Sequence, residues 1–241
     1  MPKTFFIDTS RCTACRGCQI ACKEWHELPA NKTKQRGTHQ NPPDLNPYNF
    51  KLVRFSEHKR DGRVYWNFFP DQCRHCVDPP CKLTSDMYVQ NAIIQDEATG
   101  AVLCTESTKY LRSEEVQDVI DACPYDIPRL DTGTGQLTKC NMCYSRVRQN
   151  MLPMCVKACP TGTMNFGERS KMLDMAKTRL AALKKEHPKV RLLDENEVNA
   201  IFLVIDEPEN YHEYAVAKAS TPYVPKSKLA SFISSRSRSR A

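Results

Sequence analysis

The spacing of the cysteines constrains this chain more than any other feature of its sequence. Thirteen cysteines occur in 241 residues, and all except Cys104 fall into four groups. The first group has the spacing Cys-x2-Cys-x2-Cys-x3-Cys and comprises Cys12, Cys15, Cys18 and Cys22. In chains with this spacing, the first three cysteines bind one iron–sulfur cluster and the fourth binds another. The fold must therefore bring a distant cysteine group to the first one.

A later group has the complementary pattern. Residues 140–159 have the spacing Cys-x2-Cys-x11-Cys-x3-Cys, and Pro160 follows. An exchange of ligands between the two groups predicts two sites. Site A comprises Cys12, Cys15, Cys18 and Cys159, and site B comprises Cys22, Cys140, Cys143 and Cys155. Two cysteine pairs in one short segment also suit zinc, but the first group in the same chain favours iron–sulfur clusters.

The other two groups predict a third site. A Cys-x2-Cys-x4-Cys segment supplies three thiols, and a lone cysteine followed by Pro124 supplies the fourth. This site C comprises Cys73, Cys76, Cys81 and Cys123. We expect a [4Fe–4S] cluster at each site and therefore three clusters. Cys104 has no partner at ligand spacing, so we expect a small buried apolar side chain there.

Composition and charge exclude several classes of protein. Charged residues make up 26% and hydrophobic residues 40%, which is typical of a globular protein. The longest apolar run, 200–205, is far shorter than the ~20 residues of a membrane span, and residues 1–10 lack an export signal. The net charge of +7 suits a zinc-containing nucleic-acid-binding protein. Three clusters with their thiolates, at about −2 each, would nearly cancel that charge, so we expect no nucleic-acid partner.

Several motifs around the cysteines resemble one family. They are CRGCQIACKEW at 15–25, CRHCVDPPC at 73–81, ACPY at 122–125, KCNMC at 139–143, ACPTG at 158–162 and FLVIDEP at 202–208. Over residues 1–210 the chain resembles the four-cluster, ferredoxin-type electron-transfer subunits of molybdopterin oxidoreductases. Within them it is most similar to the β-subunit of formate dehydrogenase.

The resemblance implies an α+β fold with two ferredoxin-like units in a pseudo-two-fold arrangement, inserted hairpins and a C-terminal extension. One unit, built from 1–30 and 133–170, would hold sites A and B, and the other, 71–132, would hold site C. Residues 31–70 would form a loop and hairpin insertion. A helix and strand extension at 171–220 would pack on the partner subunit, and 221–241 would form a basic tail.

The resemblance also implies partners. The chain would form a heterodimer with a molybdopterin-containing catalytic (α) subunit, where formate is oxidised, and would relay electrons to an external acceptor such as a multihaem c-type cytochrome. It would have no catalytic residues of its own. The alternative is the same relay in a polysulfide, thiosulfate or sulfoxide reductase. Location in the periplasm after co-export with the catalytic subunit is expected, and the cytoplasm is the alternative.

One departure from the family predicts that a fourth cluster is missing. The family's remaining ligand positions fall on Ser85, Ser113, Val116 and Val119, and a valine cannot bind iron. The segment after Ser113 instead predicts a helix, with Ser113 as N-cap, acidic residues in the first turn and Val116, Val119 and Ile120 on one face.

Three residues near the cysteines are candidates for tuning the clusters. His75 could donate a hydrogen bond to a cluster, and the alternative is a partly exposed loop histidine. Lys139 would raise the potential of a nearby cluster, and the alternative is a solvated lysine. Trp25 would pack over site B or against the partner subunit, and the alternative is core packing.

The remaining sequence predicts two hairpins, a helix and a strand. One hairpin joins 50–55 to 63–69 through Asp61-Gly62, and a shorter one joins 92–95 to 101–104 near Gly100. Residues 200–205 predict a buried strand. The helix spans 168–185, and its apolar residues are Met172, Met175, Ala176, Leu180 and Leu183.

Overall fold

The computed structural model describes residues 2–217, so the predicted basic tail at 221–241 lies outside the described residues. The described chain is α+β, as expected. Its strands are β1 (Lys3–Asp8), β2 (Leu52–Arg60), β3 (Arg63–Asp71), β4 (Ile93–Gln95), β5 (Val102–Cys104), β6 (Arg129–Asp131), β7 (Gln136–Thr138), β8 (Met164–Glu168), β9 (Arg191–Leu193) and β10 (Ala200–Val204). Its helices are α1 (Gly17–Trp25), α2 (Pro80–Asp86), α3 (Ser113–Asp121), α4 (Tyr144–Val147), α5 (Met154–Lys157) and α6 (Arg169–Leu183). None of these helices is long and apolar enough to cross a bilayer.

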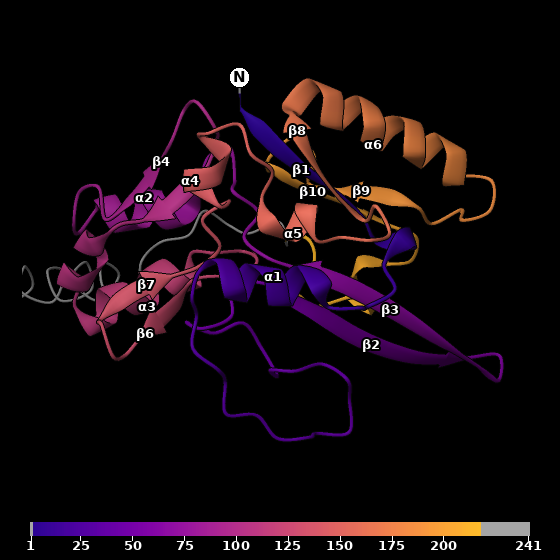
Figure 1. Cartoon of the computed structure of the whole chain (residues 1–241), viewed down its shortest axis with the longest axis horizontal. Coiled ribbons are helices and arrows are strands. Elements are labelled where there is room, and N and C mark those ends of the chain that lie inside the picture. Colours follow the sequence, from indigo (N-terminus) through magenta and orange to yellow (C-terminus); the bar gives the residue numbers. More distant parts are fainter. Residues whose placement is uncertain (1, 218–241) are drawn as a thin grey trace, which may run out of the picture.

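A four-stranded sheet in the order β8-β1-β10-β9 forms one side of the molecule (Figure 1). Successive residues of β1 point to opposite faces. Phe6 faces α6, where it packs with Met172 and Ala176. Phe5 and Ile7 face the other way, into the core shared with the β2–β3 hairpin. The sheet therefore separates a covering helix from the cysteine-bearing half of the chain.

The predicted strand near the C-terminus is confirmed, and its position explains its apolar sequence. β10 pairs in parallel with β1, from Phe5 opposite Ala200 to Asp8 opposite Leu203. All of its residues are buried. This strand therefore belongs to the chain's own core, and packing of the 171–220 extension on a partner subunit stays a prediction.

The predicted hairpin at 50–69 is confirmed with longer strands. β2 and β3 pair from Leu52 opposite Asp71 to Arg60 opposite Arg63. Asp61 and Gly62 form the turn, and both have positive φ angles, 49° and 75°. Such a two-residue turn matches the right-handed twist of the strands that it joins.

A smaller layer contains α2, α3 and two short hairpins, β4–β5 and β6–β7 (Figure 1). The β4–β5 hairpin is the one predicted near Gly100. Val116 and Val119 of α3 pack with Ile93, Val102 and the side chains around them. This layer therefore has an apolar core of its own.

Two details of the predicted helices are wrong. Ser113 is the first residue of α3 rather than its N-cap, because the Glu115 carboxylate accepts the backbone N–H of Arg112 (2.9 Å) and closes the helix one residue earlier. In α6, Met175 is 43% exposed although it follows the helical spacing of Met172 and Ala176. Met175 lies on a side of α6 that does not face the sheet.

Candidate metal centres

The four cysteines predicted for site A lie around one cavity. Cys12 and Cys15 come from the loop that enters α1, and Cys18 lies in the first turn of α1. Cys159 comes from the segment that follows α5. Residues almost 150 positions apart in sequence thus meet at one site, as the spacing predicts.

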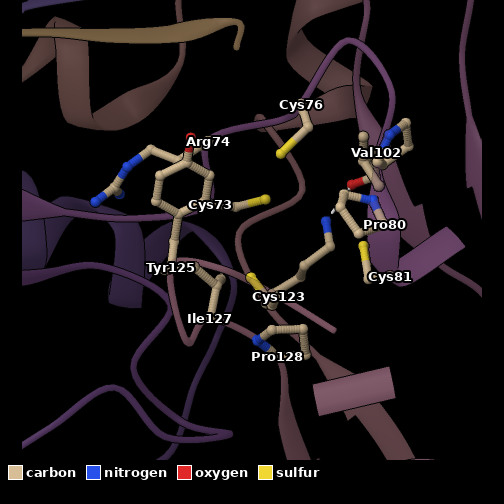
Figure 2. A pocket seen from close by; sticks show the side chains of 12 residues that line it. Cys73, Arg74, Cys76, Pro80, Cys81, Val102, Cys123, Tyr125, Ile127 and Pro128 are labelled. Atoms are coloured by element: carbon tan, nitrogen blue, oxygen red, sulfur yellow. Dashed lines mark hydrogen bonds between the residues drawn. The ribbon is translucent and has the colours of Figure 1, made fainter. Parts of the chain in front are cut away.

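The four cysteines predicted for site C surround a second cavity. Figure 2 shows the sulfur atoms of Cys73, Cys76, Cys81 and Cys123 around one common space. Tyr125, Ile127 and Pro128 line another side of it. Each of the two cavities is lined by four cysteine thiols, so the two suit the same kind of bound group.

The four thiols of site B are all buried. The nearest charged neighbours of Cys22 are Cys140, Cys155 and Cys143, so the fourth cysteine of the first motif faces the second motif. Helices α1 and α5 pack on each other. Cys18 and Cys22 lie four residues apart on α1, which is about 6 Å along a helix axis. Sites A and B are therefore close neighbours.

Three of the four Cys-x2-Cys segments share one backbone geometry. Ala14, His75 and Met142 each precede the second cysteine of a loop, and their φ angles are 54°, 47° and 62°. The backbone N–H of His75 donates to Cys73 Sγ (3.4 Å), and that of Met142 donates to Cys140 Sγ (3.5 Å). A residue in the left-handed region turns successive N–H groups inward and forms an anion-binding concavity. Each loop is therefore shaped to hold thiolate sulfur.

Burial makes most of these thiols poor acids on their own. It raises the pKa of Cys123 to about 11 and that of Cys140 to about 12. Cys159 is different: burial raises its pKa, but hydrogen bonds from Met164, Thr161 and Thr163 outweigh burial and lower it. A metal ligand must be the thiolate, so metal binding has to expel a proton from each buried thiol.

The donor sets suit a group larger than a single ion. A zinc ion holds four sulfur atoms at about 2.3 Å from its centre. Within residues 2–217, no three His, Cys, Asp or Glu side chains gather tightly enough for a single metal ion. Sites A and C instead each present four cysteine thiols around one cavity. Four cysteine thiolates are the ligand set of a [4Fe–4S] cluster.

Three of the four positions at which the family would hold a further cluster are buried, and the fourth, Ser113, is exposed. Ser85 and Val119 are fully buried. The Ser85 hydroxyl donates to the carbonyl oxygen of Lys82 (3.0 Å), which satisfies it within its own helix. Val116 and Val119 pack with Leu111 and Leu137. Side-chain packing therefore occupies this region.

His75 is fully buried, so the alternative of an exposed loop histidine is wrong. Its Nδ1 accepts the backbone N–H of Val102 (3.1 Å), which leaves the proton on Nε2. Nε2 lies 3.6 Å from Cys140 Sγ. His75 thus sits between two cysteines of site C and donates toward a cysteine of site B.

Lys139 is buried as well, so the alternative of a solvated lysine is also wrong. Its ammonium donates to the carbonyl oxygens of Val102 and Cys140 and lines the site C cavity. Trp25 is 40% exposed, which excludes core packing, and the Arg146 guanidinium lies 4.6 Å from its ring centre. Cys104 is half-buried against the apolar core of the smaller layer and does not line site C.

Sequence reasoning missed two buried cations. Lys51 is fully buried beside sites A and B, and a lone lysine between Phe50 and Leu52 was the available signal. Arg74 is buried among the rings of Phe69, Tyr125 and Phe202, with ring-centre distances of 4.5–5.2 Å.

Arg74 and Arg54 share a buried carboxylate. Asp71 accepts from Arg54 Nε (2.7 Å) and from Arg74 Nη1 (2.8 Å). Burial raises the pKa of Asp71, but the charges of Arg74 and Arg54 outweigh it and lower the pKa to about 2. This ion-pair network fixes the end of β3 immediately before Cys73.

Comparison with known proteins places this geometry in context. The model of the 4Fe-4S dicluster domain family matches residues 64–169. The chain is 59% identical over 216 residues to the formate dehydrogenase 2 subunit beta (cytochrome c-553) of Nitratidesulfovibrio vulgaris strain Hildenborough, over 89% of this chain and 99% of that relative. It is 54% identical over 217 residues to the formate dehydrogenase subunit beta of Megalodesulfovibrio gigas, over 90% and 100%. It is 32% identical over 217 residues to the nitrate-inducible formate dehydrogenase iron-sulfur subunit of Escherichia coli K12, over 86% and 70%.

Proposed function

The chain belongs to the iron–sulfur (β) subunits of formate dehydrogenases, and on that premise we propose that it relays electrons over three [4Fe–4S] clusters bound at sites A, B and C. The observation that carries the proposal is the pair of cavities, each lined by four cysteines from distant segments. Such clusters supply one-electron carriers. The chain's own part is to space, bury and charge-balance them.

The exposure of the cysteines supports an order for the relay. Cys15 of site A is exposed, and all four thiols of site B are buried. Helix α1 carries Cys18 of site A and Cys22 of site B. His75, which lies between two cysteines of site C in the sequence, contacts Cys140 of site B. Electrons would therefore enter at site A from a molybdopterin-containing catalytic subunit, pass site B and leave at site C.

A surface hollow beside site C supports its role as the exit. Cys76 and Tyr125 line this hollow, and Asp78 and Glu197 contribute acidic groups to it. Opposite charge steers redox partners to one another. A multihaem c-type cytochrome with a basic haem edge fits this position, and cytochrome c-553 appears in the name of one relative. We propose the periplasm as the location of the complex, after co-export with the catalytic subunit.

The same helix arrangement at two places supports two ferredoxin-like units related by a pseudo-two-fold axis. In the unit built from 1–30 and 133–170, α1 packs on α5, Cys18 lies on α1, and Cys159 follows α5. In the unit built from 71–132, α2 packs on α3, Cys81 lies on α2, and Cys123 follows α3. Each helix pair thus brings two cysteines to one site.

The correspondence between the two helix pairs also predicts that no second cysteine site adjoins site C in the way that site B adjoins site A. Cys22 lies four residues after Cys18, and the residue four after Cys81 is Ser85. Cys155 lies four residues before Cys159, and the residue four before Cys123 is Val119. A relay can lose a terminal station and still work, so the missing site is proposed as the outermost one.

Metal content tests the number of clusters. Full-length chain reconstituted with iron and sulfide is expected to bind about 12 Fe and about 12 acid-labile sulfides, because three complete four-thiol sites are present. Colorimetric iron and sulfide assays, with zinc measured in parallel by mass spectrometry, give the ratio. About 16 Fe per chain, or stoichiometric zinc, would contradict the proposal.

Reduction by formate tests the function itself. In the complex purified with its catalytic subunit, formate is expected to bleach the visible absorbance of the clusters under anaerobic conditions. Chemically reduced complex is not expected to be reoxidised by polysulfide, thiosulfate or a sulfoxide. Reoxidation by one of these compounds, without reduction by formate, would assign the relay to another molybdopterin oxidoreductase.

A further inference from the structure

Lys51 is a buried cation at the junction of sites A and B. It is 2% exposed and immediately precedes β2. Its ammonium donates to the carbonyl oxygen of Pro70 (3.0 Å) and to Oε1 of Gln72 (2.7 Å). Both acceptors are neutral, so these hydrogen bonds satisfy two of its three N–H groups but leave its charge uncompensated.

Contacts place Lys51 between the two sites. The Pro70 carbonyl, which accepts its hydrogen bond, belongs to a residue that lines the site A cavity, and the adjoining Leu52 packs in the same core cluster as Cys140 of site B. The charges that act most strongly on Lys51 are those of cysteine thiols. In order of strength they belong to Cys18 of site A and to Cys155, Cys140 and Cys22 of site B. An isolated buried ammonium costs many kcal/mol and is tolerated only when it is paired. The negative charge that compensates Lys51 must therefore come from the thiolate sites on its two sides.

The electrostatics of the side chain agree with this geometry. Burial lowers the pKa of Lys51, but the surrounding thiolates outweigh burial and raise the pKa above its ordinary value. The fully buried Gln72 also has an amide nitrogen, Nε2, without an acceptor among the described residues. The sulfur atoms of a bound cluster would supply an acceptor for this buried amide N–H.

The junction between sites B and C has the same design. The buried Lys139 lines the cavity of site C together with Cys73 and Cys81, and its ammonium donates to the carbonyl oxygen of Cys140 from site B (3.3 Å). Lys139 and Lys51 come from unrelated segments of the chain, the first next to a cysteine and the second at the start of a hairpin. One buried ammonium thus lies at each of the two junctions between neighbouring sites.

We propose that the fixed positive charge of Lys51 tunes the relay. It raises the reduction potentials of the clusters at sites A and B together, and it reduces the repulsion between electrons on the two clusters. This inference rests on the proposed relay. Each transfer adds one electron to a site and removes one from its donor, and Lys51 neither gains nor loses a proton. Net charge and hydrogen bonds to sulfur are the recognised determinants of cluster potential.

A potentiometric titration of the full-length chain, followed by EPR, tests the proposal. Lys51→Met keeps the length of the side chain and removes its charge. We expect the reduction equilibrium constants at sites A and B to fall at least tenfold, which is about 59 mV for a one-electron couple. Site C is expected to change less than threefold. Lys139→Met is expected to shift sites B and C and to leave site A in place.

Lys59→Met is the matched control, because Lys59 lies on β2 in an exposed position and its removal changes the net charge equally. It is expected to leave all three potentials unchanged. Equal shifts in Lys51→Met and Lys59→Met, or full iron content with unchanged potentials at sites A and B in Lys51→Met, would overturn the proposal.

A second variant decides the matter if Lys51→Met does not load iron. Gln72→Glu keeps Lys51 and places a carboxylate where Oε1 now accepts its hydrogen bond. The potentials of sites A and B are expected to fall, and no fall at these two sites would overturn the proposal. Failure of the proposed relay itself is seen separately, because the unmodified chain would then lack the three EPR-active centres.

Discussion

Replacement of Cys76 by alanine is expected to stop electron transfer to the external acceptor while formate still reduces the remaining centres of the complex. Cys76 lies both in the site C cavity and in the surface hollow proposed as the exit. Loss of a ligand removes the last carrier before that surface. Acceptor reduction should fall by more than the 10–100-fold that changes around ligands commonly cause. Stopped-flow reduction of the cytochrome, with formate as donor, measures it.

Cys104→Ala is the control for this experiment. Cys104 is a cysteine of the same layer that does not line site C, so its replacement should leave iron content and acceptor reduction unchanged. Unimpaired acceptor reduction in Cys76→Ala would show that electrons leave elsewhere. So would a structure of the complex in which site C is covered by the catalytic subunit.

The second large effect concerns the exchange of ligands between sites A and B. Cys159→Ser is expected to abolish the same EPR signal as Cys15→Ser, although the two residues lie in different motifs. Cys22→Ser is expected to abolish the same signal as Cys143→Ser. The physical reason is that thiolate is the soft ligand that selects iron–sulfur clusters, and a hydroxyl is not. Each replacement should remove up to about four of about twelve Fe.

The pairing of the signals decides between two assignments. If Cys22→Ser matched Cys15→Ser, the first motif would hold one metal centre by itself and the exchange of ligands would be refuted. The structure favours the exchanged assignment, because Cys159 shares a cavity with the first motif and Cys22 lies next to thiols of the second. Cys104→Ser, which should keep both signals, again controls for the loss of a thiol.

The cysteine spacing predicted more about this protein than its secondary-structure pattern did. A Cys-x2-Cys loop forms a complete local unit, because one left-handed residue such as His75 turns an N–H toward the sulfur two residues earlier. The four-residue interval between Cys18 and Cys22 places them one helical turn apart. Both features depend only on nearby residues, so they can be predicted from the sequence.

The secondary-structure predictions failed where several alternatives were locally equivalent. Ser113 is a good N-cap by residue type, but the carboxylate of Glu115 caps the helix one residue earlier. Met175 and Met172 both follow a helical spacing, and only the position of α6 on the sheet selects Met172 for burial. The strand at 200–204 was predicted, but its place beside β1 depends on pairing across almost 200 residues.

The sequence by itself determined the family and the kind of bound cluster, and it predicted three sets of four thiols, because ligand spacing is a local property of the chain. Only the tertiary structure decided which other side chains are buried beside those thiols. His75 and Lys139 were candidates because they adjoin cysteines, but nothing in the sequence placed Lys51 near a site, and a lysine is ordinarily exposed. Their burial arises from contacts between distant segments, such as Lys51 with Pro70 and His75 with Cys140. Electrostatic energy depends on those distances and on exclusion of water, and neither is encoded in a short stretch of sequence.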